Sequence, residues 1–257
     1  MCYPCCVSDQ PEQLKDYARV YGSPGEGARV AGMFRVMWPV LILLLLTGYV
    51  LGVALPLPIA NTKPVAGILL LMLAAALAYA VRWSRERFKR FVKGARGEEE
   101  TARLLSVLPS GYHVFHSLQL DHAGVSDFDH IVVGPSGLFV IETKNWSGEI
   151  KVKDGVILVN GEAPERSPLE QVKDEAADLL AWLREREKVA PEIQPVLCFA
   201  SNRLPEGFQR VDGVVVCGGN ALHQVLVKQG DFGRGLDGVL TRVLSSLQTQ
   251  VAKGLGE

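Results

Sequence analysis

The sequence lacks an excess of charge of either sign. Its 257 residues carry 27 Lys and Arg against 28 Asp and Glu, which gives a formal net charge of −1. That balance excludes a protein that binds nucleic acid through an overall basic surface, although a local basic groove is compatible with it. The sequence also lacks an internal repeat, which excludes the solenoid and propeller architectures.

Cysteine is scarce, and three of the five cysteines lie at the start, at Cys2, Cys5 and Cys6. A structural zinc site normally needs four ligands, and no nearby His completes this set. Reduced thiols on a cytoplasmic tail are therefore favoured over zinc, and a lipid-modified thiol stays open. Cys198 and Cys217 fall in apolar runs, so we expect them to be small core residues.

A signal peptide of the usual form is not expected at the start, because the first apolar run begins too late in the chain. Residues 1–35 are mostly polar and contain Gly22, Pro24, Gly25 and Gly27. This composition argues against a packed core. We therefore expect residues 1–35 to form a cytoplasmic N-terminal tail.

Two long apolar runs follow, at residues 37–60 and 65–81. Neither run has a polar face, and a membrane-spanning helix needs about 20 residues. The alternative, two buried helices of a soluble core, would leave a polar face on each. The sequence therefore predicts a two-helix transmembrane hairpin in the lipid bilayer at residues 36–83, with a tight turn at residues 61–63.

Basic residues flank both apolar runs, whereas the connecting turn contains only Lys63. Cytoplasmic segments carry this excess of Lys and Arg. We therefore expect a multi-pass protein of the inner (cytoplasmic) membrane with both termini in the cytoplasm. The basic stretch at residues 84–93 should continue the second helix out of the membrane, where it would attract anionic lipid headgroups or contact nucleic acid.

The most informative stretch is residues 127–144, in which two apolar β-branched runs flank Gly-Pro-Ser-Gly. This pattern predicts a β-hairpin. In a symmetric turn Val133 pairs with Leu138 and Ile131 with Val140, which sets Asp129 opposite Glu142. Opposed residues share a face of the sheet, and the strand period of two adds Lys144 to it.

Two carboxylates this close repel each other unless a positive charge lies between them. A divalent cation with oxygen ligands would relieve the repulsion of Asp129 and Glu142, and Lys144 would supply a fixed positive charge beside it. The alternative is a charged strand end that reaches solvent, with Lys144 paired to Glu142. Spacing alone does not decide between these interpretations.

Asp129 followed by Glu142-Thr143-Lys144 resembles the Asp…Glu-x-Lys signature of the restriction-endonuclease-like superfamily, PD-(D/E)xK. The longer string DFDHIVVGPSGLFVIETKNWSGEI is similar to the nuclease-related domain (NERD) family in particular. Gly94-Ala95-Arg96-Gly97-Glu98 matches that family's Gly-x-x-Gly-Glu, and Pro168-Leu169-Glu170-Gln171 matches its Pro-Leu-x-Gln. The resemblance covers about residues 94–200. Asp127 departs from the polar residue, such as Gln or Glu, expected there, so its role is open.

The resemblance implies an α/β fold with a restriction-endonuclease-like mixed β-sheet flanked by helices, here in residues 94–257. It also implies a nuclease that hydrolyses phosphodiester bonds in nucleic acid, with DNA as the expected partner. Asp129, Glu142 and the backbone carbonyl of Thr143 would hold Mg²⁺ or Mn²⁺, and Lys144 would orient or activate the attacking water.

Two further residues enter the implied catalytic set. Glu98 lies on the apolar stripe of a helix expected at residues 97–108, and it would act through a second metal ion or a water. Gln171 would position Lys144 or the nucleotide, near the start of a helix that the Ser167-Pro168-Leu169-Glu170 capping box predicts. The rival function is a catalytically inactive, membrane-tethered docking module for nucleic acid or protein.

Overall fold

The structure is a computed structural model, and it describes residues 17–25, 37–49, 52, 63–121, 127–201, 204, 207–228 and 237–254. The predicted cluster of Cys2, Cys5 and Cys6 lies outside these residues. Residues 61–62 of the turn expected at residues 61–63 also lie outside them, together with most of residues 50–60.

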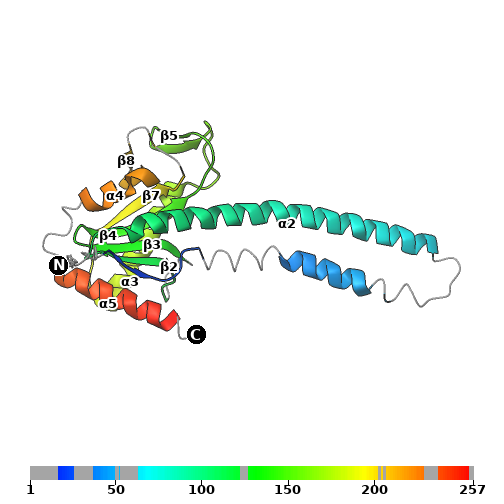
Figure 1. Cartoon of the computed structure of the whole chain (residues 1–257), viewed down its shortest axis with the longest axis horizontal. Helices are drawn as coiled ribbons and strands as arrows, with labels where there is room; N and C mark the ends of the chain where they lie inside the picture. Colours follow the sequence, from blue (N-terminus) through cyan, green and yellow to red (C-terminus); the bar gives the residue numbers. More distant parts are fainter. Residues whose placement is uncertain are drawn as a thin grey trace, which may run out of the picture.

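A seven-stranded mixed β-sheet forms the centre of the domain, in the order β1-β2-β3-β4-β7-β9-β8 (Figure 1). Parallel pairs join β1 to β2, β4 to β7 and β7 to β9, and the other neighbours are antiparallel. The strands are β1 (Arg19–Tyr21), β2 (His113–Leu118), β3 (Phe128–Gly134), β4 (Gly137–Lys144), β7 (Ile193–Phe199), β8 (Phe208–Val211) and β9 (Val214–Gly218). A separate hairpin pairs β5 (Ile150–Lys153) with β6 (Val156–Val159).

Helices cover both faces of this sheet, so the predicted mixed α/β architecture is confirmed. On one face, α3 (Pro168–Glu187) and α5 (Asp237–Gly254) pack over a core that includes Phe115, Ile131 and Leu197. On the other face, α4 (Gly219–Lys228) and the C-terminal part of α2 (Lys63–Ser106) pack over Val132, Phe139 and Val196. Neighbouring residues of a strand therefore enter different cores, as the strand period of two requires.

The β3–β4 hairpin has the register that the sequence predicts. Val133 pairs with Leu138 and Ile131 with Val140. Strand β4 is buried from Gly137 to Thr143, because it lies between β3 and β7 and carries apolar cores on both faces. This burial fixes the position of the polar residues at its end.

A strand that the sequence pattern did not predict lies at the edge of the sheet. Residues 19–21, within the expected N-terminal tail, form β1 and run parallel to β2. The ring of Tyr21 stacks on Phe115 at 4.7 Å between centroids, and its hydroxyl accepts a hydrogen bond of 2.7 Å from Gln248 on α5. The chain before the apolar runs therefore packs on the domain that follows them.

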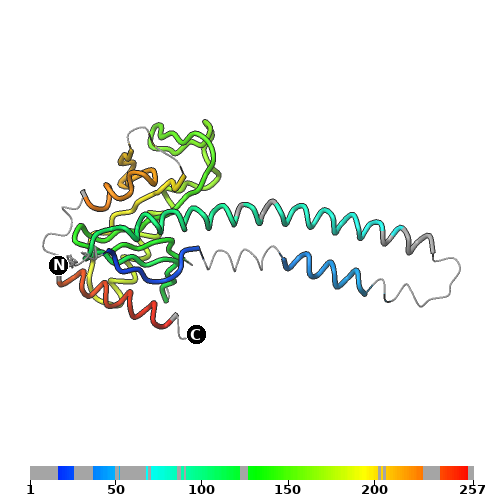
Figure 2. The backbone as a smooth tube through the Cα atoms, viewed as in Figure 1, coloured from blue at the N-terminus to red at the C-terminus, as the bar shows by residue number. Residues whose placement is uncertain are grey.

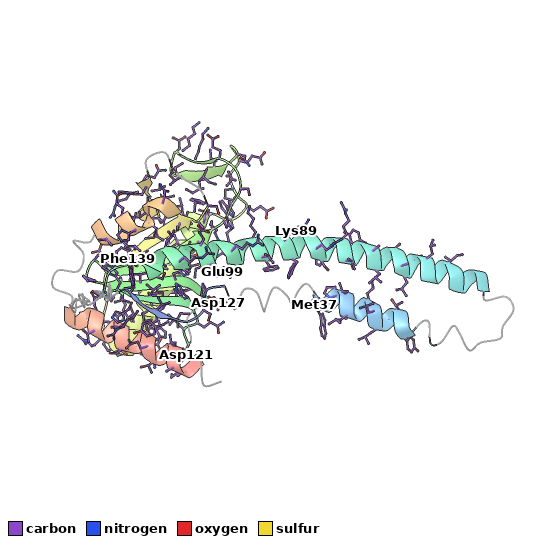
Figure 3. All side chains as sticks on the ribbon, viewed as in Figure 1. Met37, Lys89, Glu99, Asp121, Asp127 and Phe139 are labelled. Atoms are coloured by element: carbon purple, nitrogen blue, oxygen red, sulfur yellow. The ribbon has the colours of Figure 1, made fainter. Side chains whose placement is uncertain are left out.

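Helix α2 is continuous for 44 residues and extends far beyond the sheet (Figure 2). Residues 37–49 form a second helix, and Met37 and Lys89 contribute to one apolar pocket between the two (Figure 3). Among the described residues, no helix has both the length and the apolar character that crossing a membrane requires. The described helices therefore do not support the transmembrane hairpin predicted at residues 36–83.

Candidate active site

The predicted site residues converge where β3 begins and β4 ends. The hydrogen-bonded ladder between the two strands runs from Gly134–Gly137 to His130–Ile141. Beyond it, the carboxylate of Asp129 accepts a hydrogen bond of 2.8 Å from the backbone N–H of Thr143. The Asp129 carboxylate thus replaces the backbone carbonyl that would accept the next hydrogen bond of the ladder. This bond holds Asp129 against the end of β4.

Glu142 and Lys144 project from the same face of β4, two residues apart. The Lys144 ammonium donates to Glu142 Oε1 and, at 2.9 Å, to Gln171 Oε1. The Gln171 amide nitrogen donates to the same Glu142 oxygen at 2.7 Å. Three side chains from two motifs, 27 residues apart, therefore form a closed hydrogen-bonded triangle, with the Glu142 side chain only 5% exposed.

Helix α3 presents Gln171 to the sheet because its start is fixed. Ser167 is the N-cap residue and accepts from the backbone N–H of Glu170, and Pro168 occupies the first turn. The helix predicted from the capping box is thus confirmed. Its buried stripe of Val172, Ala176 and Leu179 places Gln171 at the edge of the core beside β4.

Glu175 is a member of this network that the sequence reasoning missed. Its Oε1 accepts a hydrogen bond of 3.0 Å from the Gln171 amide, one helical turn away. The side chain is buried, and its Oε2 has no hydrogen-bond partner among the described residues. Burial, and then the negative charge of Glu142, raises the pKa of Glu175 to about 8. The sequence signal that could have identified Glu175 is its position, since it is an acidic residue on the apolar stripe of the helix, four residues after Gln171.

Glu98 reaches the same region from α2, on the other side of the strand end. Partial burial, followed by the charge of Glu142, raises the pKa of Glu98, and a backbone hydrogen bond from Gly25 opposes that shift. Gly97 allows this approach, since a Cβ there would lie 2.5 Å from the Cβ of Asn145. The glycine before the acid is thus needed for the contact between α2 and the segment after β4.

The carboxylates act on one another electrostatically. Burial and the charges of Glu142 and Glu98 raise the pKa of Asp129 well above its usual range, against the stabilising hydrogen bond from Thr143. Asp127, whose role the sequence left open, contributes to the raised pKa of Glu98. Several acids therefore share a region with Lys144, whose ammonium is hydrogen-bonded to one of them, Glu142.

A cavity of about 980 Å³ opens at this point, and its lining includes Glu98, Asp129, Glu142, Thr143 and Lys144. Gln171 does not line the cavity but lies behind it, in contact with Glu142 and Lys144. The fold thus brings five of the predicted site residues to one cavity. The sixth, Gln171, is hydrogen-bonded to two of them from behind.

His130 follows Asp129 directly in the sequence, but its side chain is buried in the core. Its Nδ1 lies 2.7 Å from Nδ1 of His116 on β2, and both imidazoles are buried. Burial lowers the pKa of His116 to about 4 and that of His130 further below its usual range. The two rings form a neutral hydrogen-bonded pair on the strands that carry the site.

The oxygen groups fit a hard divalent cation by their chemistry. Mg²⁺ commonly uses one or two carboxylates and completes its coordination with water and substrate phosphate. The mutual repulsion of Asp129 and Glu142 is what such a cation would relieve. Within the part of the chain that the structure describes, no group of three or more His, Cys, Asp and Glu side chains could hold a metal ion. A cation here would depend on these two acids, the Thr143 carbonyl and non-protein ligands.

The segment that carries Asp129, Glu142 and Lys144 is similar to a known family. Residues 93–200 match the nuclease-related domain, NERD. The matched segment contains all the predicted site residues. The nuclease-related domain thus spans the strands and the helix that build the cavity.

One curated relative is similar to part of this chain. An uncharacterized protein of Bacillus anthracis is 41% identical over 61 residues, which are 23% of this chain and 29% of that relative. The match therefore covers less than a third of the relative's length. No solved structure matches this chain.

Proposed function

We propose that the nuclease-related domain hydrolyses phosphodiester bonds in nucleic acid, with DNA as the expected substrate, and that it depends on Mg²⁺ or Mn²⁺. The observation that carries this proposal is the position of Lys144. Its ammonium lines the same cavity as Asp129 and Glu98 and is held by Glu142 and Gln171. An inert surface has no need of an oriented lysine among partly buried acids.

In this proposal Asp129, Glu142 and the Thr143 carbonyl hold the cation. When bound, the ion polarises the scissile phosphate and lowers the pKa of a coordinated water. Asp129 is suited to this role because the hydrogen bond that it accepts from the Thr143 N–H, at 2.8 Å, fixes the carboxylate on the backbone. A fixed ligand costs no reorganisation when the ion arrives.

Lys144 stabilises the negative charge that builds on the phosphate and orients the attacking water. Gln171 positions Lys144, since its Oε1 accepts from the ammonium while its amide nitrogen is bound by Glu142 and Glu175. These two acceptors fix which end of the amide faces Lys144. Glu98 faces the cavity from α2 and is placed to accept a proton from a water.

Membrane attachment is a second part of the proposal, with the lipid bilayer as partner of residues 36–83. Its support is the sequence pattern together with exposed apolar side chains on the helix of residues 37–49 and on α2. Leu45 and Leu71 are each 75% exposed and Tyr79 is 72% exposed. In this proposal both termini and the nuclease-related domain lie on the cytoplasmic side of the inner membrane.

Reporter fusions at both ends of the chain and in the turn at residues 61–63 test the topology. Cytoplasmic reporters at the ends and an external one at the turn are expected, because basic residues flank only the outer ends. A C-terminus outside the cytoplasm would overturn the topology and a role on cytoplasmic nucleic acid.

The activity is tested by single-turnover cleavage with Mg²⁺ or Mn²⁺ of single-stranded, double-stranded and branched substrates. Wild type should cut, and Lys144→Met should lose about 10²–10³ in rate, because one electrostatic stabiliser is lost. Lys253→Met, at an exposed position of α5, is the matched control. Equal cutting by wild type and Lys144→Met would place the activity elsewhere. No cutting of any substrate would favour the docking module.

A further inference from the structure

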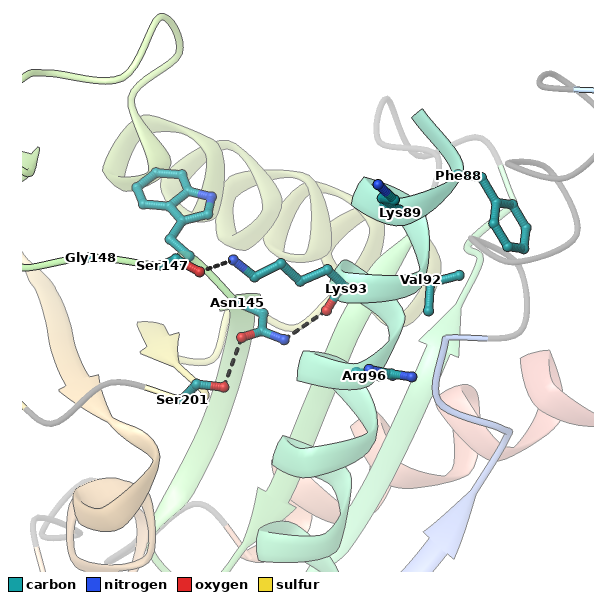
Figure 4. Close-up of a pocket in the computed structure, with 10 residues that line it drawn as sticks. Phe88, Lys89, Val92, Lys93, Arg96, Asn145, Ser147, Gly148 and Ser201 are labelled. Carbon is teal, nitrogen blue, oxygen red and sulfur yellow. Dashed lines mark hydrogen bonds between the residues drawn. The ribbon is translucent and has the colours of Figure 1, made fainter. Parts of the chain in front are cut away.

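A second cavity, of about 780 Å³, adjoins the candidate active site (Figure 4). The two cavities share four lining residues, Lys93, Asn145, Trp146 and Ser147. In this shared wall Asn145, Trp146 and Ser147 form the segment that directly follows Lys144 at the end of β4, and Lys93 joins them from α2. A ligand that leaves the active site over this wall therefore enters the second cavity.

The charges of the two cavities are opposite. In the lining of the active-site cavity the four acids Glu98, Asp129, Glu142 and Glu162 outnumber the two cations Lys93 and Lys144. The charged residues that line the second cavity are Lys89, Lys93 and Arg96, and all three are cations. They follow a spacing of four and three along α2, which places them on one side of a rigid helix. A cationic surface of this kind fits an anionic ligand.

Hydrogen bonds hold the shared wall against α2. Asn145 Nδ2 donates to the Lys93 carbonyl at 2.7 Å, and Asn145 Oδ1 accepts from the Ser201 hydroxyl at 2.8 Å. The Lys93 ammonium donates to the Ser147 hydroxyl (Figure 4). Both sides of the cavity are thus tied together, and Lys93 is held in place without a ligand.

Trp146 gives the wall an aromatic surface between the two cavities. Its ring is partly buried and lies 5.7 Å from Phe199, at an interplanar angle of 49°. Phe199 is buried in the core, so the indole has a fixed support. Aromatic side chains beside a cationic groove are the pattern by which proteins bind single nucleic-acid strands, with bases on the rings and phosphates on the cations.

We propose that the second cavity is a phosphate-binding subsite for the nucleic-acid strand, next to the phosphate held at Lys144. Lys89 and Arg96 bind the phosphates of the strand. Lys93 and Ser147 form the edge of the subsite, and Trp146 stacks on a base where the strand crosses the shared wall. The nature of this ligand rests on the proposed nuclease function. The shared wall favours a nucleic acid over a lipid headgroup, because a polyanion that reaches Lys144 must pass these cations.

The test uses the full chain in detergent, with a short fluorescent single-stranded oligonucleotide and EDTA to prevent cleavage. Binding is measured over a series of salt concentrations for wild type, for Lys89→Ala/Arg96→Ala and for Arg242→Ala/Lys253→Ala. The last pair removes the same charge from α5, on the opposite face of the sheet. Lys93 is left intact because its side chain holds Ser147.

Removal of Lys89 and Arg96 should weaken binding and should lower the slope of log K against log salt by about 0.7 to 0.9 for each lost phosphate contact. The α5 pair should leave that slope at the wild-type value. An unchanged slope in Lys89→Ala/Arg96→Ala would overturn the subsite. Trp146→Leu should weaken binding without a change of slope, since stacking releases no counterions.

Three further outcomes separate this subsite from its alternatives. Flotation with vesicles of phosphatidylcholine and phosphatidylglycerol tests the lipid ligand, and loss of vesicle binding with an unchanged oligonucleotide slope would overturn the proposal. If wild type cleaves nucleic acid while the variant keeps its slope, the subsite fails and the nuclease stands. If the slope falls but wild type cuts no substrate, the subsite stands and the nuclease fails.

Discussion

The ammonium of Lys144 lies 2.9 Å from the amide oxygen of Gln171, and this contact joins the end of β4 to the first turn of α3. The same amide donates through its nitrogen to Glu142 and Glu175. One side chain therefore links the lysine to two acids. Its orientation is fixed because its nitrogen already has two acceptors, so only the oxygen can face Lys144.

Gln171→Ala should slow single-turnover cleavage by about 10- to 100-fold, as loss of a supporting residue commonly does. Substrate affinity should change little, because Gln171 does not line the cavity. Gln224→Ala, at an exposed position of α4, is the control. A wild-type rate in Gln171→Ala would show that the amide does not position Lys144.

Glu142→Gln should weaken Mn²⁺ binding by about tenfold or more without unfolding the domain. The new amide keeps an oxygen for Lys144 and Gln171, and it removes one charge that repels Asp129. Without metal, stability should thus be unchanged or slightly higher. Isothermal titration calorimetry measures the affinity, with the exposed Glu149→Gln as control. Unchanged affinity would remove Glu142 from the metal site.

Glu175 should make the folded state less stable as pH rises. The unfolded chain releases this proton near the ordinary pKa of 4.5, whereas the folded chain releases it near a pKa of about 8. Between these values the folded state binds the extra proton, so stability decreases with increasing pH. Glu175→Gln should therefore stabilise the protein at pH 7, by up to about 3 kcal/mol.

Urea unfolding at pH 5 and at pH 8 measures this effect. The gain from Glu175→Gln should be small at pH 5 and larger at pH 8. Glu185→Gln, exposed on the same helix, should change the free energy of unfolding by less than about 0.5 kcal/mol. A gain that is equal at both pH values would contradict the buried, protonated state of Glu175.

The His116–His130 pair should have the opposite pH dependence. The unfolded chain protonates His116 near pH 6.5, and the folded chain only near its pKa of about 4. Between these values the unfolded state binds the extra proton, so stability falls as pH decreases. His116→Gln should lower stability at pH 7 through the altered bond to His130, and it should flatten the loss between pH 6.5 and pH 4. The exposed His223→Gln on α4 should leave the slope unchanged.

The segment of residues 17–25 should stabilise the nuclease-related domain. Residues 94–257 alone lack β1, which pairs with β2 and places Tyr21 on Phe115. In a second chain, residues 17–25 are joined to residue 94 by a short glycine linker. Its free energy of unfolding should be about 1–2 kcal/mol higher than that of residues 94–257 alone. Tyr21→Ser in the joined chain should remove most of that gain. Equal stability of the two chains would show that β1 contributes nothing.

The sequence by itself determined the local features that depend on neighbouring residues. The β3–β4 register followed from two apolar runs of period two around one turn, because a slip of one residue would expose every core side chain. The start of α3 followed from Ser167-Pro168-Leu169-Glu170, since capping acts within one helical turn. The membership of Asp129, Glu142 and Lys144 in one cavity followed from that register.

The tertiary structure alone decided the contacts that join distant segments. Glu175 resembled an ordinary helix acid, and only burial beside Glu142 gives it a raised pKa. The three residues of β1 are too short to show a period, so only pairing with β2 identifies them as a strand. The requirement for glycine at position 97 arises from Asn145, 48 positions later, and the shared wall of the two cavities exists only because α2 packs there. Such contacts depend on which surfaces meet in the folded chain, and no local sequence pattern predicts which surfaces will meet.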